Sequence, residues 1–567
     1  MPSTLSTAER GHEGDGDAQS VGPASAATGI GRITLLLYLL LFPAIGVLVA
    51  CIGFCDPDTC WHLALGKWMF VHHCLPYVDP FSANVHDFVF VNPRLPLMQH
   101  EWMSDLMLYG IFALAGARGL LAVTAVLSSL SLAIIPAILM RRNQVPHTVA
   151  LALILSTVWA SAFRLWVRPE AISFLCMSAL ILINDICLQT RSKRVAAWST
   201  VATGLLMALW TNCHALFVTG IAYLGGYLLL SLFDLLPLKL NGAEVAVQKD
   251  GEEAAAPIRV KRSSVLLGTA VVATLCTPWS FALWNYIARV VASPISHANK
   301  ENGPLTDLAS PTSFPLFALL IFFLVIELWP TFKGRLGRVI AGVRDQEVQA
   351  GTAGPQIQVG TADPPIHVTS LVLGLAAFVI AVLFRRLTPL ALLVVMAAAS
   401  IMHRKRFGAV LFVNQSNSKL ALAEIVGCIL SCAGACVIAS HSLAAPVIPS
   451  PSRLFSPPYT AMQILQDHRP SGRLLNDSKF GSMIAWDWKN PPDIFVDGRF
   501  DSFDRNLVRD YNRMRLCQGN WQQLLDRYRI SWVFFPPRTP LVIELAKEPG
   551  WSVFYSDASA VVLQRAP

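Results

Sequence analysis

Long apolar runs separated by short polar loops make up most of this chain. A helix needs about 20 apolar residues to cross a bilayer, and about eleven runs approach that length. The pattern therefore predicts a mainly α-helical, polytopic transmembrane bundle. The expected spans are Ile33–Phe54, Gly119–Met140, Thr148–Phe163, Ala171–Leu188, Val195–Asn212, Ala215–Leu236, Val265–Ile287, Phe314–Trp329, Val368–Leu383, Leu387–Met402 and Leu420–Ala439.

Basic clusters between the runs set the expected orientation. If the spans alternate, all of these clusters fall on one side, which the positive-inside rule makes cytoplasmic. The N-terminus is then inside, and the loop 55–118 and the segment from 445 are outside. Met103–Ala115 is apolar but short, and we interpret it as an amphipathic helix lying on the membrane. The clusters are Arg141-Arg142, Arg191/Lys193/Arg194, Arg259/Lys261/Arg262, Lys333/Arg335/Arg338 and His403–Arg406.

The two ends of the chain differ from the apolar middle. Residues 1–32 are polar and glycine-rich, as in a disordered cytoplasmic tail, and residues 33–444 form the expected transmembrane domain with its outer loop 55–118. Residues 445–567 alternate short apolar runs with helical patterns, which predicts a small extracytoplasmic α/β domain. Its expected strands are R-L-L-N, M-I-A-W-D-W, D-I-F-V-D-G-R, W-V-F-F-P-P and A-V-V-L-Q-R, with a helix after the prolines at 457–458 and helices at Arg505–Arg515, Trp521–Tyr528 and Pro540–Lys547.

Composition agrees with a membrane protein. Hydrophobic residues make up 54% and charged residues 14% of the chain, whereas soluble proteins are about 25% charged. The net charge of +8 comes from clusters between apolar runs, so it indicates membrane topology rather than nucleic-acid binding. The chain has no Walker loop, no H-E-x-x-H and no paired C-x-x-C pattern, so an ATP-driven pump and a zinc protease are unsupported.

The first outer loop concentrates the residue types that chemistry needs. Asp56 and Asp58 flank Pro57, and paired carboxylates can share a divalent cation such as Mg²⁺ or Mn²⁺, or supply a general base. His62 follows Asp58 by four residues, on the same face if a helix starts at Thr59. Asp58 could instead cap that helix. Further along the loop stand Asp79, His100 and Glu101.

Each of these later residues also has a structural interpretation. Glu101 could be a first-turn acid favoured by the helix dipole, and Asp79 could simply set a turn. Arg164 and Arg168 lie in F-R-L-W-V-R-P-E near an outer helix end, where their planar guanidinium groups suit a phosphate. The alternative for Arg168 is an ion pair with Glu170. His214, in W-T-N-C-H, is either a site residue or an interhelical histidine, and Arg385 and Arg386 are weaker phosphate candidates.

The motifs D-P-D-T-C-W-H-L-A-L-G-K-W, P-Y-V-D-P-F-S-A, H-E-W, R-P-E, W-T-N-C-H and V-D-G-R together resemble a family of bacterial polytopic membrane proteins. That family is similar to the GT-C glycosyltransferases, which include protein mannosyltransferases and aminoarabinose transferases. The resemblance covers most of the chain. It implies an extracytoplasmic active site in the bacterial inner membrane, a polyprenyl-phosphate-linked sugar donor, and a loop aspartate acting as base or metal ligand.

Carried onto this sequence, the resemblance makes Asp58 the best match to the loop carboxylate, with Asp56 beside it. The expected activity is transfer of a sugar from a polyprenyl-phosphate donor to a glycan, lipid or protein acceptor. The expected catalytic residues are Asp58, Asp56 and Glu101, the expected substrate-binding residues are His62, His100, Arg164, Arg168 and His214, and the expected metal ligands are Asp56 and Asp58. Two other functions stay open: a transporter or lipid-handling protein, and a non-catalytic scaffold that binds polysaccharide.

Overall fold

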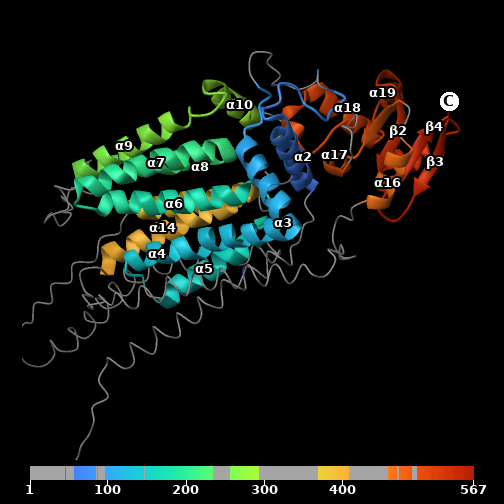
Figure 1. The fold of residues 1–567 in the computed structure, drawn as a ribbon. Helices are drawn as coiled ribbons and strands as arrows, with labels where there is room; N and C mark the ends of the chain where they lie inside the picture. The colour runs from blue at the N-terminus through green and yellow to red at the C-terminus, as the bar shows by residue number, and fades with distance from the viewer. Residues whose placement is uncertain are drawn as a thin grey trace, which may run out of the picture.

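The computed structural model describes Ile45 and residues 57–84, 86, 96–145, 147–233, 256–292, 368–407, 458–468, 472–487 and 494–566. Several expected features lie outside these residues: the tail 1–32, Asp56, the spans Phe314–Trp329 and Leu420–Ala439, and all but Ile45 of the first span. The described part is a helical bundle followed by a smaller C-terminal unit with a four-stranded sheet (Figure 1). This confirms the mainly helical fold with a small C-terminal α/β unit.

The bundle consists of long apolar helices around a shared apolar core. By length and hydropathy, Trp102–Arg142 and Glu170–Gln189 can each cross a membrane, and Val149–Arg164, Phe217–Leu232 and Val372–Leu383 are shorter apolar helices. The total number of spans stays a prediction. The helices are α3 (Trp102–Ser129), continued by η2 (Leu130–Ile134) and α4 (Ile135–Arg142), then α5 (His147–Ser161), α6 (Glu170–Gln189), α7 (Lys193–Cys213), α8 (Phe217–Phe233), α9 (Ala256–Ala273), α10 (Phe281–Val291), α13 (Val368–Leu383) and α14 (Thr388–Phe407).

A break at Gly116 divides the long helix α3. The continuous apolar stretch Trp102–Arg142 has 41 residues, which would extend about 61 Å as one straight helix, twice the bilayer core of about 30 Å. Gly116 has φ 61° and ψ −158°, a conformation that favours glycine. The break falls between the expected surface helix Met103–Ala115 and the expected span Gly119–Met140.

The expected span Val265–Ile287 is not one helix. It is divided between α9, which starts nine residues earlier than expected, and α10, with Pro278 in the turn that separates them. Proline lacks the amide hydrogen that a helix interior requires. The basic cluster at 259–262 therefore belongs to the first turns of α9, where Arg262 donates to the carbonyl oxygens of Cys187 (2.8 Å) and Thr190 (2.6 Å) at the end of α6.

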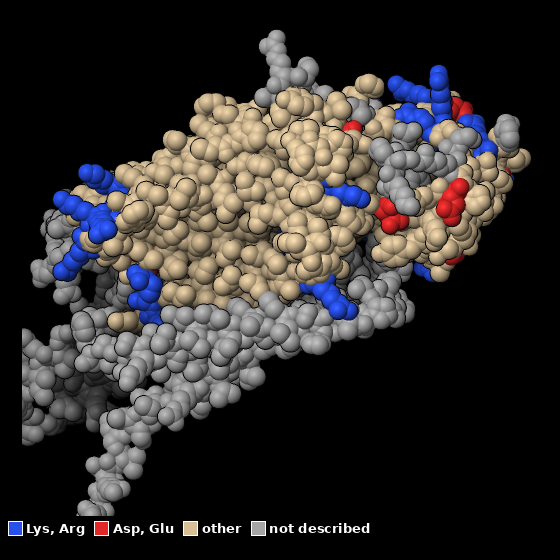
Figure 2. All heavy atoms as spheres, in the orientation of Figure 1, with Lys and Arg blue, Asp and Glu red and all other residues tan. Residues whose placement is uncertain are grey.

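Basic side chains gather at one end of the bundle, on the left in Figures 1 and 2. There α4 ends in Arg141 and Arg142, α7 begins with Lys193 and Arg194, and α9 begins near Arg262. The C-terminal unit lies at the opposite end, next to α2 and α3 (Figure 1). This separation fits the expected orientation, and the sidedness of the two termini stays a prediction.

The C-terminal unit is built around a sheet of order β1-β2-β4-β3, in which β1 and β2 are parallel and the other pairs are antiparallel. Helices on either side bury apolar faces against the strands. Its elements are α16 (Tyr459–Asp467), β1 (Arg473–Asn476), α17 (Ser478–Asp487), η6 (Phe500–Ser502), α18 (Arg505–Arg515), α19 (Trp521–Arg527), β2 (Ile530–Phe535), α20 (Pro540–Leu545), β3 (Trp551–Ser556) and β4 (Val561–Arg565).

Two of the expected strands in this unit are wrong. M-I-A-W-D-W lies mostly in helix α17, where Met483, Ile484 and Ala485 are all buried. A short apolar run in a fully buried helix cannot be distinguished from a buried strand by its periodicity. D-I-F-V-D-G-R forms only an isolated bridge, between Ile494 and Ser82 of the outer loop.

Helix α2 (Pro57–His72) connects the bundle to the C-terminal unit, because it packs on both α3 and α17. Its contact with α3 is so close that a β-carbon at Gly66 would overlap the carbonyl oxygen of Asp105. This approach sets the N-terminal residues of α2 beside the start of α3.

Candidate functional site

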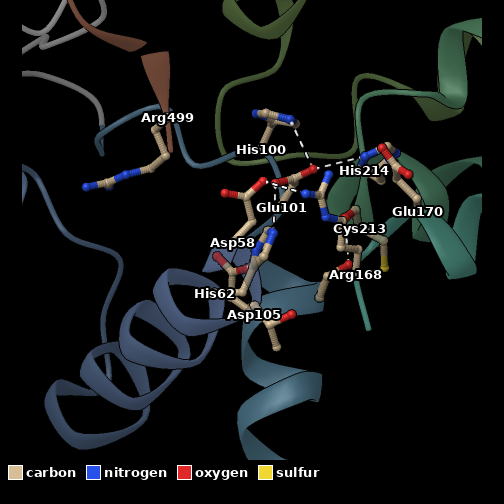
Figure 3. A network of polar contacts seen from close by, with 12 residues as sticks. Asp58, His62, His100, Glu101, Asp105, Arg168, Glu170, Cys213, His214 and Arg499 are labelled. Carbon is tan, nitrogen blue, oxygen red and sulfur yellow. Dashed lines mark hydrogen bonds and ion pairs between the residues drawn. The ribbon is translucent and has the colours of Figure 1, made fainter. Parts of the chain in front are cut away.

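Six of the expected site residues lie together at the bundle end that faces the C-terminal unit (Figure 3). They come from four places in the fold: the first turns of α2, the turn that leads into α3, the loop before α6 and the loop after α7. The six are Asp58, His62, His100, Glu101, Arg168 and His214.

Glu101 lies at the centre of this group, with three imidazoles around its carboxyl. Nε2 of His214 is 3.1 Å from Oε1, Nε2 of His100 is 3.6 Å from Oε1, and Nε2 of His62 is 3.9 Å from Oε2. The Glu101 side chain is only 10% exposed. The carboxyl can therefore exchange protons with imidazoles while bulk water is largely excluded.

Burial changes the protonation of this cluster. It raises the pKa of Glu101 to about 8, against the opposing charge of Arg386. Burial also lowers the pKa of His100 to about 4 and holds the pKa values of His62 and His214 well below their usual value. At neutral pH the site thus favours a protonated Glu101 and neutral imidazoles, since desolvation disfavours charged forms.

Asp105 fixes the orientation of His62. Its Oδ1 lies 2.6 Å from His62 Nδ1, and the residue is fully buried. With Nδ1 engaged in this contact, Nε2 is left facing Glu101. The sequence analysis did not select Asp105, although an acid four residues after Glu101 in an otherwise apolar helix was a usable signal.

Asp58 and Arg168 form a second, more open part of the site. Arg168 Nη2 lies 2.9 Å from Asp58 Oδ2, and the Asp58 side chain is 31% exposed. Thr59 donates to the carbonyl oxygen of Val167 at 2.7 Å, which holds the Arg168 loop against α2. Because Asp58 lies within the first turn of α2, it is not the residue that caps the helix, and the capping interpretation is wrong.

Glu170 is buried against two arginines of neighbouring helix ends. It pairs with Arg164, and its Oε1 accepts from Arg386 Nε at 2.8 Å. Arg168 contacts Asp58, and the alternative of an Arg168–Glu170 pair stays a prediction. Arg164 is engaged with Glu170 beside the central cluster, so among the expected phosphate ligands Arg168 is the better placed.

Asp79 sets a turn, as its structural interpretation predicted, and it also contacts the C-terminal unit. Its Oδ1 accepts from the backbone N–H groups of Phe81 and Ser82, both at 2.8 Å. Its other oxygen pairs with Arg499. From the sequence, D-I-F-V-D-G-R was an expected strand and V-D-G-R was part of the resemblance, and Arg499 had no expected role.

The described residues around Asp58 do not provide a set of metal ligands. No group of three or more His, Cys, Asp or Glu side chains that could hold an ion occurs in the described ranges. Asp58 Oδ2 already has a guanidinium as its cationic partner. Asp56 lies outside the described residues, so a cation shared by Asp56 and Asp58 stays a prediction, and no step below depends on it.

No family model and no curated protein matches the chain. ArnT from Cupriavidus metallidurans bound to undecaprenyl phosphate is similar with a TM-score of 0.44 and 13% identity, over 96% of this chain and 98% of that one. The same protein in the apo state has a TM-score of 0.45 and 13% identity, over 95% and 98%. ArnT is an aminoarabinose transferase of the GT-C superfamily, the group that the sequence resembles. A TM-score below 0.5 assigns no activity, which depends on the geometry of the site.

Proposed function

We propose that the protein is an integral membrane glycosyltransferase of GT-C type, which transfers a sugar from a polyprenyl-phosphate donor to an envelope acceptor at the outer face. The observation that supports it best is the Asp58–Arg168 pair, 2.9 Å apart and partly exposed, at the bundle end away from the basic clusters. A carboxylate can take a proton there, and a guanidinium can hold a phosphate.

The surroundings of this pair suit a lipid-linked donor. Apolar residues on the outside of the bundle, such as Leu205, Leu229 and Val272, are exposed and can face lipid tails. The sequence has no loop for binding nucleotide phosphates. A donor with its tail in the lipid would bring its phosphate to Arg168 from the side of the membrane.

The proposed step begins at the acceptor hydroxyl. Its oxygen attacks the anomeric carbon of the sugar while Asp58 accepts its proton. The bond between the anomeric carbon and the phosphate oxygen breaks, and polyprenyl phosphate leaves with the bonding electrons, its charge stabilised by Arg168. Glu101, with His214, His100 and His62, would bind polar groups of the substrates and relay the proton.

Binding of undecaprenyl phosphate to the purified full-length protein tests the phosphate site directly. Arg168→Gln is expected to weaken binding by about 10- to 100-fold, since a charge-assisted hydrogen bond contributes roughly 1.5–3 kcal/mol. The matched control is Arg191→Gln at the opposite end of the bundle, which should bind as the unaltered protein does. Equal affinity in both variants would contradict this role of Arg168.

Proteoliposomes distinguish transfer from the transporter alternative. With an undecaprenyl-phosphate-linked sugar inside or outside, a transferase forms a covalent product with the acceptor and releases undecaprenyl phosphate. Movement of the intact donor across the bilayer without any covalent product would instead show that the protein is a transporter.

A further inference from the structure

A short segment of the C-terminal unit, residues 494–499, lies against the outer loop of the bundle. The amide of Ala83 donates to the Ile494 carbonyl at 2.9 Å, and the amide of Ile494 donates to the Phe81 carbonyl at 3.2 Å. Asn84 Nδ2 donates to the Phe495 carbonyl at 2.8 Å. The segment is therefore attached to the same loop that carries the site residues.

Arg499 strengthens this attachment. Its guanidinium pairs with both Asp497 and Asp79, whose side chains are fully buried, and it lies 5.7 Å from the ring centroid of Trp61. Trp61 precedes His62 in α2. Figure 3 shows Arg499 on the Asp58 side of the site, with its guanidinium turned away from the Asp58 carboxylate.

Gly498 stands between these two anchors and touches Asp58. A β-carbon at this position would overlap Asp58 Oδ1 and lie 3.3 Å from its carboxyl carbon. The backbone of Gly498 is outside the left-handed region, so an alanine there would displace the Asp58 carboxylate without straining the backbone. The amide of Gly498 donates to Ser482 Oγ of α17 at 3.2 Å, and this hydrogen bond attaches the turn to α17.

We propose that the Asp497-Gly498-Arg499 turn is a positioning element of the transfer site. Gly498 lies against Oδ1 of Asp58 while Arg168 holds Oδ2, so the carboxylate is confined between the C-terminal unit and the bundle. The C-terminal unit thereby sets the direction in which the base faces the acceptor. Only the expected effect on kcat rests on the proposed function, and the contact with Asp58 does not.

Gly498→Ala in the full-length protein tests the contact, with Gly550→Ala as matched control because a β-carbon at Gly550 would meet nothing within 4 Å. The added methyl should turn the Asp58 carboxylate away without unfolding the protein, since a carboxylate at the end of a side chain can rotate. We expect kcat to fall by about tenfold or more, within the range for loss of a positioned base. KM for the donor should not rise.

Affinity for undecaprenyl phosphate provides a readout that does not depend on catalysis. Turning away or deleting the Asp58 carboxylate removes an anion that competes with phosphate for Arg168. Gly498→Ala and Asp58→Ala should each therefore bind the lipid several-fold more tightly, and the double variant should bind no more tightly than either. If the two substitutions change lipid affinity non-additively but the unaltered protein transfers no sugar, the contact between Gly498 and Asp58 is supported and the proposed function is rejected.

A second variant covers the case in which Gly498→Ala fails to fold. Ser482→Ala removes the hydrogen bond behind the turn and should change kcat and lipid affinity in the same directions, by less. The proposal is overturned if Gly498→Ala behaves as Gly550→Ala does, or if its effect on lipid affinity adds fully to that of Asp58→Ala. It is equally overturned if Gly498→Ala fails to fold and Ser482→Ala leaves both quantities unchanged.

Discussion

Glu101 shows, at the scale of one residue, how burial prepares a carboxyl for proton transfer. Its side chain is 10% exposed and has an imidazole nitrogen 3.1 Å away, and its pKa is raised to about 8. A carboxyl with a pKa near the working pH is better suited to exchange protons than one at its usual value.

The raised pKa of Glu101 predicts a pH-dependent stability. Between about pH 7.5 and 8.5 the folded protein keeps part of a proton on Glu101 that the unfolded chain has lost, so stability should fall as pH rises, by at most about 1.4 kcal/mol per pH unit. The three histidines act in the opposite direction near pH 6.5, where each is partly protonated in the unfolded chain but neutral in the folded protein. This opposing slope has nearly vanished above about pH 7.5.

Thermal unfolding in detergent at several pH values measures this slope. Glu101→Gln should remove most of the fall in midpoint between about pH 7.5 and 8.5. If the thermal midpoints of the variant and of the unaltered protein change equally with pH, Glu101 does not hold a proton in the folded protein at these pH values.

The sequence predicted part of this site for identifiable reasons. Asp58, His62, His100 and Glu101 stood out because polar residues were dense in one loop next to a membrane span. Asp105 was missed because it stands alone in an apolar helix. Gly498 was missed because a glycine shows no pattern until the approach of Asp58 Oδ1 is seen in the structure.

At the scale of elements, one buried carboxylate joins three helix ends. Glu170 starts α6, Arg164 ends the short helix η3 (Ala162–Arg164), and Arg386 lies in η5 (Arg385–Leu387) between α13 and α14. These pairs hold the ends of α5, α6 and α13 together beside the site.

Glu170→Gln should lower the free energy of unfolding by about 3–5 kcal/mol, because it leaves the guanidinium of Arg164 buried beside a neutral amide. Glu544→Gln is the control. Glu544 Oε1 lies 2.9 Å from Lys547 Nζ, and both side chains are exposed. Exposed ion pairs contribute at most about 1 kcal/mol to stability. Thermal midpoints measured in one detergent compare the two variants, and equal midpoints would mean that the Glu170 pairs do not stabilise the bundle.

Helices and strands were predicted well where the spacing of apolar residues fitted only one type of element. The expected span Val368–Leu383 coincides with α13, and the expected helix Arg505–Arg515 coincides with α18. The helix α17 was taken for a strand because both of its faces are buried, against α2 and the sheet. Strand β3 was not predicted, since W-S-V-F-Y-S is mostly exposed and shows no regular alternation of buried and exposed positions.

At the scale of the whole molecule, the basic clusters at 141–142, 193–194 and 259–262 lie at the end of the bundle opposite the C-terminal unit. This arrangement predicts that the C-terminal unit is extracytoplasmic. Alkaline phosphatase fused after residue 567 should be active in a bacterial host, and the same reporter fused after Arg142 should be inactive. The reverse pattern of activities would place the site on the cytoplasmic side and contradict the orientation.

We propose Asp58 as the base for transfer from a polyprenyl-phosphate donor. The most direct measurement is the rate of covalent product formation in proteoliposomes by Asp58→Asn, which keeps the shape of the side chain and removes its basicity. We expect a loss of about 10²–10⁴-fold in kcat, as for the loss of a general base, with undecaprenyl phosphate still bound. Full transfer by Asp58→Asn would contradict it.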